Sequence, residues 1–133
     1  MYLLFLNFIQ LNKAELDPEF QNEWIPFELD LNVDYLSKRN CHTSVIFKHY
    51  MIIFGGKEGY GQKKSMRDIH IFDIQNLGWI NDVECIGIVP DVRMGHSADI
   101  YEENKMVVYG GWNGTRVLND VPVLIMKEND KRE

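Results

Sequence analysis

An internal repeat constrains this chain more than any other feature of its sequence. The segment KRNCHTS at 38–44 matches VRMGHSA at 92–98, and both contain an R-x-x-H motif. The segment YMIIFGG at 50–56 matches KMVVYGG at 105–111, and both end in Gly-Gly. Because these landmarks recur in the same order with separations of 54 and 55 positions, we expect two copies of one structural unit.

Two further landmarks follow nearly the same period. Asp68 and Asp120 lie 52 positions apart, each ahead of a β-branched segment, and Trp24 recurs 55 positions later as Trp79. The stretch from the second glycine of the Gly-Gly pair to the aspartate spans 12 positions in the first copy and nine in the second. We therefore expect a loop of variable length after each Gly-Gly pair.

The strand signals predict an all-β fold. The segments at 43–47 and 97–101 are short alternating or β-branched runs. Those at 51–54 and 106–109 are continuous apolar runs, which are typical of strands covered on both faces. The segment at 68–74 alternates with a period of two, and no stretch of helical length keeps a helical period. Each repeat is therefore expected to form a four-stranded antiparallel sheet.

Taken in order, these landmarks resemble the kelch repeats of a β-propeller. The resemblance covers nearly the whole chain and implies antiparallel four-stranded blades. The glycines would end a buried strand where no side chain fits. The tryptophans would supply apolar area near the sheet edge, and the arginines and histidines would make structural hydrogen bonds. The residues expected to serve this framework are Arg39, His42, Gly55, Gly56, Asp68, Trp79, Arg93, His96, Gly110, Gly111, Asp120 and Trp24.

The repeats divide the chain into four segments. Residues 1–38 are expected to supply the last two strands of a preceding blade, with a polar insertion at 12–21 that forms a surface loop or, alternatively, a short helix. Residues 39–84 form a complete repeat, 85–126 a second repeat without its fourth strand, and 127–133 a charged tail. A propeller typically has four to eight blades. We therefore expect a partial propeller from a longer kelch protein, with self-association through exposed blade faces as an alternative.

The overall charge argues against nucleic-acid and membrane partners. The net charge is −6 and the isoelectric point is near 5.2, whereas a nucleic-acid-binding face is basic. The apolar run at 2–9 is far shorter than a membrane span and lacks a basic segment ahead of it. Cys41 and Cys85 are expected to be reduced thiols, and the expected location is the cytoplasm.

The variable loops are the expected binding surface, because loops concentrate binding residues and Trp, Tyr and Arg dominate interface hot spots. We predict a non-enzymatic protein-interaction scaffold of the adaptor, trafficking or cytoskeletal-effector type, whose partner is a protein. A solvated loop without a partner is the alternative reading of each residue. The candidate partner-binding residues are Lys57, Tyr60, Lys63, Lys64, Arg67, Trp112 and Arg116.

No catalytic residue, metal ligand or cofactor is expected. Gly56 and Gly61 have the glycine spacing of a phosphate-binding loop, but Gln62 occupies the position of its lysine. His49 and His70 are the histidines outside the motif, and nothing pairs with them at ligand spacing. Some propellers that resemble this chain carry out chemistry, so an enzyme or an enzyme-associated regulatory propeller is the alternative function.

Overall fold

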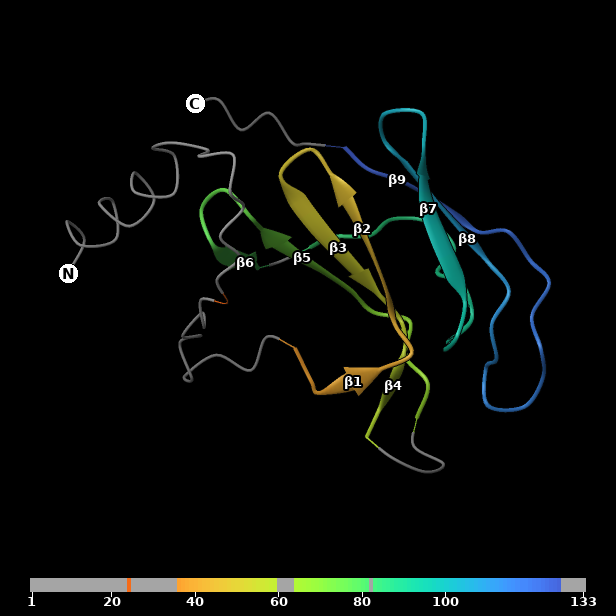
Figure 1. Cartoon of the computed structure of the whole chain (residues 1–133). Helices are drawn as coiled ribbons and strands as arrows, with labels where there is room; N and C mark the ends of the chain where they lie inside the picture. Colours follow the sequence, from red (N-terminus) through yellow and green to blue (C-terminus); the bar gives the residue numbers. More distant parts are fainter. Residues whose placement is uncertain (1–23, 25–35, 60–63, 82, 128–133) are drawn as a thin grey trace, which may run out of the picture. The chain divides into compact units, whose positions relative to one another are not determined.

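A computed structural model describes residues 24, 36–59, 64–81 and 83–127 (Figure 1). The chain divides into two compact units, Met1–Asn32 and Val33–Glu133, and the second unit contains every described strand. The strands expected before residue 36 and the tail after residue 127 lie outside the described residues. Within those residues no helix is long and apolar enough to cross a membrane. Both cysteines are exposed free thiols.

The first repeat forms a four-stranded antiparallel sheet in the order β2-β3-β5-β6. Its strands are β2 (Thr43–Phe47), β3 (Tyr50–Phe54), β5 (Ile69–Asp73) and β6 (Gly78–Ile80). The turn from β5 to β6 is held by Asp73, whose carboxylate accepts the backbone N–H groups of Gln75 and Asn76 at 2.9 Å. This arrangement confirms the predicted all-β class.

The second repeat forms a three-stranded antiparallel sheet in the order β7-β8-β9. Its strands are β7 (Ser97–Tyr101), β8 (Lys105–Tyr109) and β9 (Val123–Ile125). Two further strands of two residues each, β1 (Arg39–Asn40) and β4 (Lys57–Glu58), pair with each other next to the first sheet. Sequence reasoning did not predict this pair, because pairing between strands this short leaves no periodic signal.

The core lies between the two sheets. The first sheet contributes Val45, Phe47, Ile52 and Phe54, and the second contributes buried side chains of β8 together with Met126. Burying one such side chain stabilises the fold by about 1.5–3 kcal/mol. β2 and β7 are in contact along the boundary between the sheets. The two repeats therefore share one apolar interior.

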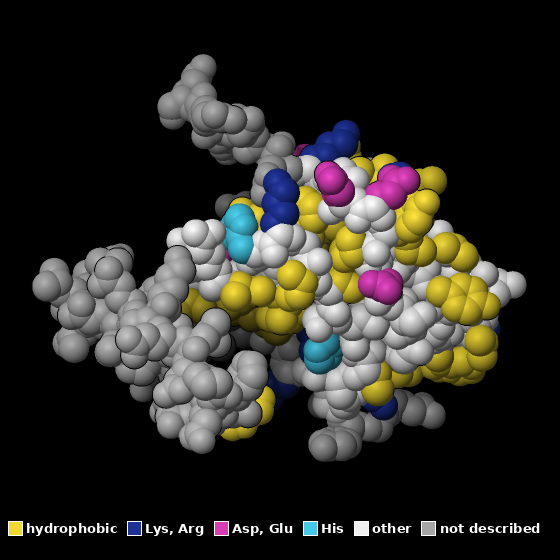
Figure 2. Space-filling model, turned by 45° about the horizontal axis from the view of Figure 1, so that its top comes forward, with side chains coloured by type: hydrophobic (Ala, Val, Ile, Leu, Met, Phe, Trp, Pro, Cys, Tyr) yellow, Lys and Arg dark blue, Asp and Glu magenta, His cyan; other side chains and the backbone are white. Residues whose placement is uncertain are grey.

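The outward face of the second sheet is exposed. Tyr101 on β7, Tyr109 on β8 and Ile125 on β9 all have exposed side chains, and Figure 2 shows hydrophobic side chains gathered on the molecular surface. The prediction that both apolar runs are covered on both faces is confirmed for β3, which has three consecutive buried residues. It is wrong for β8, because no described strand packs on the face that carries Tyr109.

Candidate interaction site

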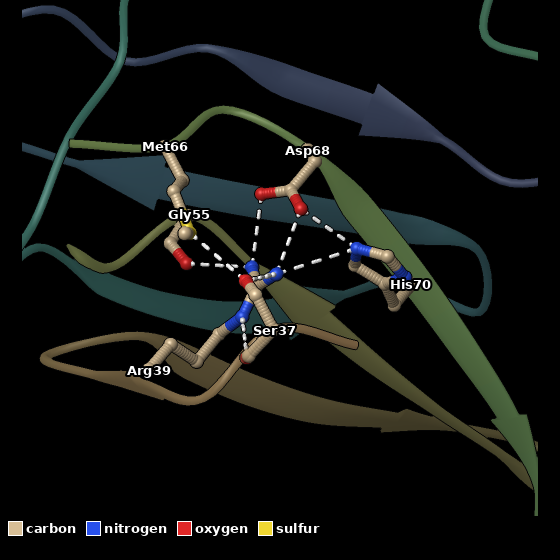
Figure 3. Close-up of polar contacts among 6 residues, drawn as sticks. All are labelled: Ser37, Arg39, Gly55, Met66, Asp68 and His70. Carbon is tan, nitrogen blue, oxygen red and sulfur yellow. Dashed lines mark hydrogen bonds and ion pairs between the residues drawn. The ribbon is translucent and has the colours of Figure 1, made fainter. Parts of the chain in front are cut away.

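Arg39 joins three parts of the first repeat through its guanidinium group (Figure 3). Nη1 donates to the carbonyl oxygen of Gly55 at 3.1 Å and to Asp68 Oδ1 at 2.9 Å, and Nη2 donates to Asp68 Oδ2 at 2.8 Å. His70 Nε2 lies 2.7 Å from the same Oδ2. Burial raises the pKa of Asp68, but the hydrogen bonds and charges of Arg39 and His70 outweigh it and hold this pKa at about 2.

Arg93 makes the same contacts in the second repeat. Nη1 donates to the carbonyl oxygen of Gly110 and to Asp120 Oδ1, both at 3.0 Å, and Nη2 donates to Asp120 Oδ2 at 2.8 Å. The Arg93 side chain is 0% exposed. Each arginine thus ties the Gly-Gly end of one strand to the aspartate that precedes the next strand, by the paired geometry that guanidinium and carboxylate groups favour.

His96 lies between the two repeats, whereas His42 is exposed. His96 Nε2 is 2.8 Å from Thr43 Oγ1, and its ring meets the ring of Phe54 edge to face with centroids 5.2 Å apart. Burial, together with the charges of Arg93 and His42, lowers the pKa of His96 to about 4, so this ring is neutral at pH 7. The two motif histidines therefore occupy different environments.

The Gly-Gly pair of the first repeat sits in a tight junction. Gly55 has a φ of 62°, and a Cβ placed there would lie 2.8 Å from the carbonyl oxygen of Arg93. Gly56 has a φ of 93°, and its Cβ would lie 2.7 Å from the carbonyl oxygen of Asn40. Both the backbone conformation and the available space require glycine at these two positions. The second repeat therefore fits against the first only because Gly55 has no side chain, whereas Gly56 leaves space for Asn40 and His42 of its own repeat.

The two motif tryptophans differ. Trp79 on β6 packs edge to face on Phe72, with ring centroids 5.1 Å apart, and its ring centroid lies 6.3 Å from that of His70. It thus covers the edge of its own sheet. Trp24 is the single described residue of the first unit and is 99% exposed, so the packing expected for Trp24 is not observed.

The predicted binding loop of the first repeat leaves the sheet at β4 and returns at Ser65, which forms a bridge with Lys57. Lys57 is half-buried, and Lys64 and Arg67 are exposed. Of the candidate binding residues, Tyr60 and Lys63 lie outside the described part of the chain. The described part of this loop therefore presents two exposed cationic side chains.

The predicted binding loop of the second repeat is closed by bridges from Trp112 to Met94 and to Val117. Asn113 Oδ1 accepts the backbone N–H groups of Thr115 and Arg116 at 2.9 Å, which fixes the turn. The guanidinium of Arg116 lies 3.7 Å from the carboxylate of Asp91. Trp112 and Arg116 are both exposed.

The structure brings the two loops together. A Cβ placed on Gly114 would lie 4.0 Å from Ser65 Oγ, so the tip of the second loop faces the closing bridge of the first. Both loops follow the Gly-Gly pair of their repeat, and they lie at the same end of the two sheets (Figure 1). Lys64, Arg67, Trp112 and Arg116 therefore belong to one neighbourhood, although their sequence positions alone did not require it.

Comparison with known proteins agrees with this geometry. The sequence profile of the KLHDC2/KLHL20/DRC7 Kelch-repeats domain matches residues 9–132. The chain belongs to the kelch-repeat family. The arginine–aspartate pairs and the glycine junction are thus the contacts by which this kelch chain builds its two repeats.

Several larger proteins are similar to this kelch chain. The Rab9 effector protein with kelch motifs of Rattus norvegicus is 33% identical over 86 residues, which is 64% of this chain and 23% of that protein. Host cell factor 1 of the same species is 35% identical over 91 residues, which is 64% of this chain and 4% of that protein. Acyl-CoA-binding domain-containing protein 4 of Arabidopsis thaliana is 27% identical over 74 residues, covering 56% of this chain and 11% of that protein. The kelch chain thus spans less than a quarter of these relatives.

Metal sites and clefts are the other features that could bind a ligand. Among the described residues no three His, Cys, Asp or Glu side chains are placed to hold a metal ion. Two clefts, of about 390 and 590 Å³, are lined mostly by aliphatic side chains such as those of Ile71, Leu124 and Val108. We call the surface formed by Lys64, Arg67, Trp112 and Arg116 the loop edge; it is a described surface that combines exposed cationic and aromatic side chains.

Proposed function

We propose that this kelch chain is a non-enzymatic protein-interaction module that binds a partner protein through its two Gly-Gly loops. The adjacency of these loops carries the proposal, because it combines cationic and aromatic side chains from both repeats in one surface. The framework arginines are engaged with aspartates and glycine carbonyls of their own repeats, so the loops are free to differ from repeat to repeat. The cytoplasm is the proposed location.

The side chains of the loop edge favour a partner with acidic groups. Lys64 and Arg67 are exposed cations on a chain whose net charge is −6. Trp112 adds an aromatic surface of the kind enriched in interface hot spots. Arg116 is already close to Asp91, so we expect it to contribute less than Lys64. One relative is named as an effector of Rab9, and an effector role of this general kind fits the proposal.

A charge-reversal experiment tests this proposal. The Lys63→Glu/Lys64→Glu variant of the full chain is compared with the unchanged chain as bait for proteins from the source cells, with quantitative mass spectrometry of what is retained. Proteins bound through the loop edge are expected to be lost from the variant by tenfold or more. Lys127→Glu is the control, because it changes an exposed lysine at the far end of the second sheet. Equal retention of every partner by all three baits contradicts the proposal.

A further inference from the structure

The residue two positions before each motif arginine is held in the same way in both repeats. Arg39 Nε donates to the carbonyl oxygen of Ser37 at 3.4 Å, and Arg93 Nε donates to the carbonyl oxygen of Asp91 at 3.3 Å. Because the framework arginine fixes the backbone here, the side chain of this residue starts from an equivalent place in each repeat. We call this place, residue 37 in the first repeat and residue 91 in the second, the flanking position.

In both repeats the side chain at the flanking position contacts the stretch that follows the Gly-Gly pair of its own repeat. Ser37 Oγ lies 3.9 Å from Met66 Sγ (Figure 3). Asp91 Oδ2 accepts from Asn113 Nδ2 at 3.4 Å and lies 3.7 Å from the guanidinium of Arg116. The two contacts are equivalent in place but differ in charge, because one is made by a hydroxyl and the other by a carboxylate.

This difference makes the two halves of the loop edge electrically unlike. The side chain of Arg116 is 73% exposed, but the carboxylate of Asp91 lies beside it and would repel an acidic group that approached. Asn113 holds the two together, because it contacts Asp91 and also accepts the backbone N–H of Arg116 at 2.9 Å. In the first repeat the serine at the flanking position adds no charge to the loop that carries Lys64 and Arg67.

We propose that Asp91 is a specificity-determining residue of the loop edge, which keeps Arg116 from an acidic partner and directs the acidic groups of that partner to the first loop. The second loop then contributes the aromatic surface of Trp112 and no further free cation. A complementary partner has an acidic group opposite Lys64 and Arg67 and an apolar group opposite Trp112. This inference rests on the loop function proposed above.

Replacing Asp91 by the residue that the first repeat has at the flanking position tests the inference. The full chain and its variants serve as baits, at limiting concentration, for proteins from the source cells. Mass spectrometry then follows those proteins that Lys63→Glu/Lys64→Glu loses. Their retention should rise about two- to fivefold for Asp91→Ser, the range that release of an exposed ion pair supports. Glu103→Ser is the matched control, because it removes one exposed carboxylate from the turn at the opposite end of β8, and it should retain these proteins like the unchanged chain.

Arg116→Gln distinguishes release of Arg116 from a general effect of charge. By itself it should lower retention less than Lys64→Gln does, because Asp91 already pairs with Arg116. Combined with Asp91→Ser, it should cancel the rise. If circular dichroism shows that Asp91→Ser unfolds, Asp91→Asn removes the charge and keeps the shape of the side chain.

Two results would overturn the inference alone: equal retention by Asp91→Ser and Glu103→Ser, or a rise of the same size with and without Arg116→Gln. Retention of every protein by Lys63→Glu/Lys64→Glu would instead overturn the proposed loop function, and this inference with it.

Discussion

At the scale of single residues, a buried arginine organises each repeat. Arg39 and Arg93 both hold one aspartate by two hydrogen bonds and one glycine carbonyl by a third. Among the described groups of this framework, the fold changes the pKa values of Asp68 and His96 most.

These shifts predict a loss of stability in acid over two separate pH ranges. The folded pKa of His96 is about 4 and its ordinary value is 6.5, so the unfolded state binds the proton first and stability falls as pH drops from 6.5 to 4. The folded pKa of Asp68 is about 2 against 3.8, so its stabilisation is complete above 3.8 and is lost as pH falls towards 2. Urea unfolding at several pH values measures how the free energy of unfolding depends on pH. Between pH 6.5 and 4 this free energy should fall less steeply for His96→Gln than for the unchanged chain. An equally steep fall in the variant would contradict the assignment to His96.

The sequence was sufficient to single out both histidines but not to distinguish them. His42 and His96 stand in the same motif, so the repeat predicts the same role for both. Their burial differs because His96 has a neighbouring sheet to enter and His42 has none among the described residues. A property that depends on the neighbouring repeat cannot be predicted from the residues of one repeat.

At the scale of elements, sequence patterns predicted best the strands whose residues alternate or are continuously apolar. The apolar and alternating segments predicted β2, β3, β5, β7 and β8 close to their observed bounds. In the first repeat β5 begins directly after the aspartate, whereas β9 begins three residues after it, because Pro122 has no N–H to donate to a strand ladder. The adjacency of the two loops was not predictable, since it depends on how the two sheets pack.

The junction between the elements predicts different costs for two equivalent glycines. Gly55→Ala and Gly110→Ala both place a side chain at positive φ, which costs about 1–2 kcal/mol. At Gly55 the new methyl group also meets the carbonyl oxygen of Arg93 at 2.8 Å, and this overpacking should add about 1–3 kcal/mol. Urea unfolding of the two variants measures both losses. Equal losses of unfolding free energy would show that the second repeat does not press on Gly55.

At the scale of the whole molecule, two kelch repeats pack through one junction, and equivalent groups of the second repeat have no described partner. Because equivalent groups stand in both repeats, their contacts can be compared within one molecule. The N–H of Gly56 donates to Arg93, and the N–H of Gly111 has no described acceptor. The framework residues explain the stability of the junction, and the loops beside it supply the surface proposed for a partner.

Amide hydrogen exchange of these two glycines, followed by NMR, tests this claim most directly. The measurement uses the full chain. We predict that Gly56 exchanges at least tenfold more slowly than Gly111 relative to the intrinsic rate of each amide, because exchange at Gly56 requires the two repeats to separate. Equal protection of Gly56 and Gly111 would contradict the account.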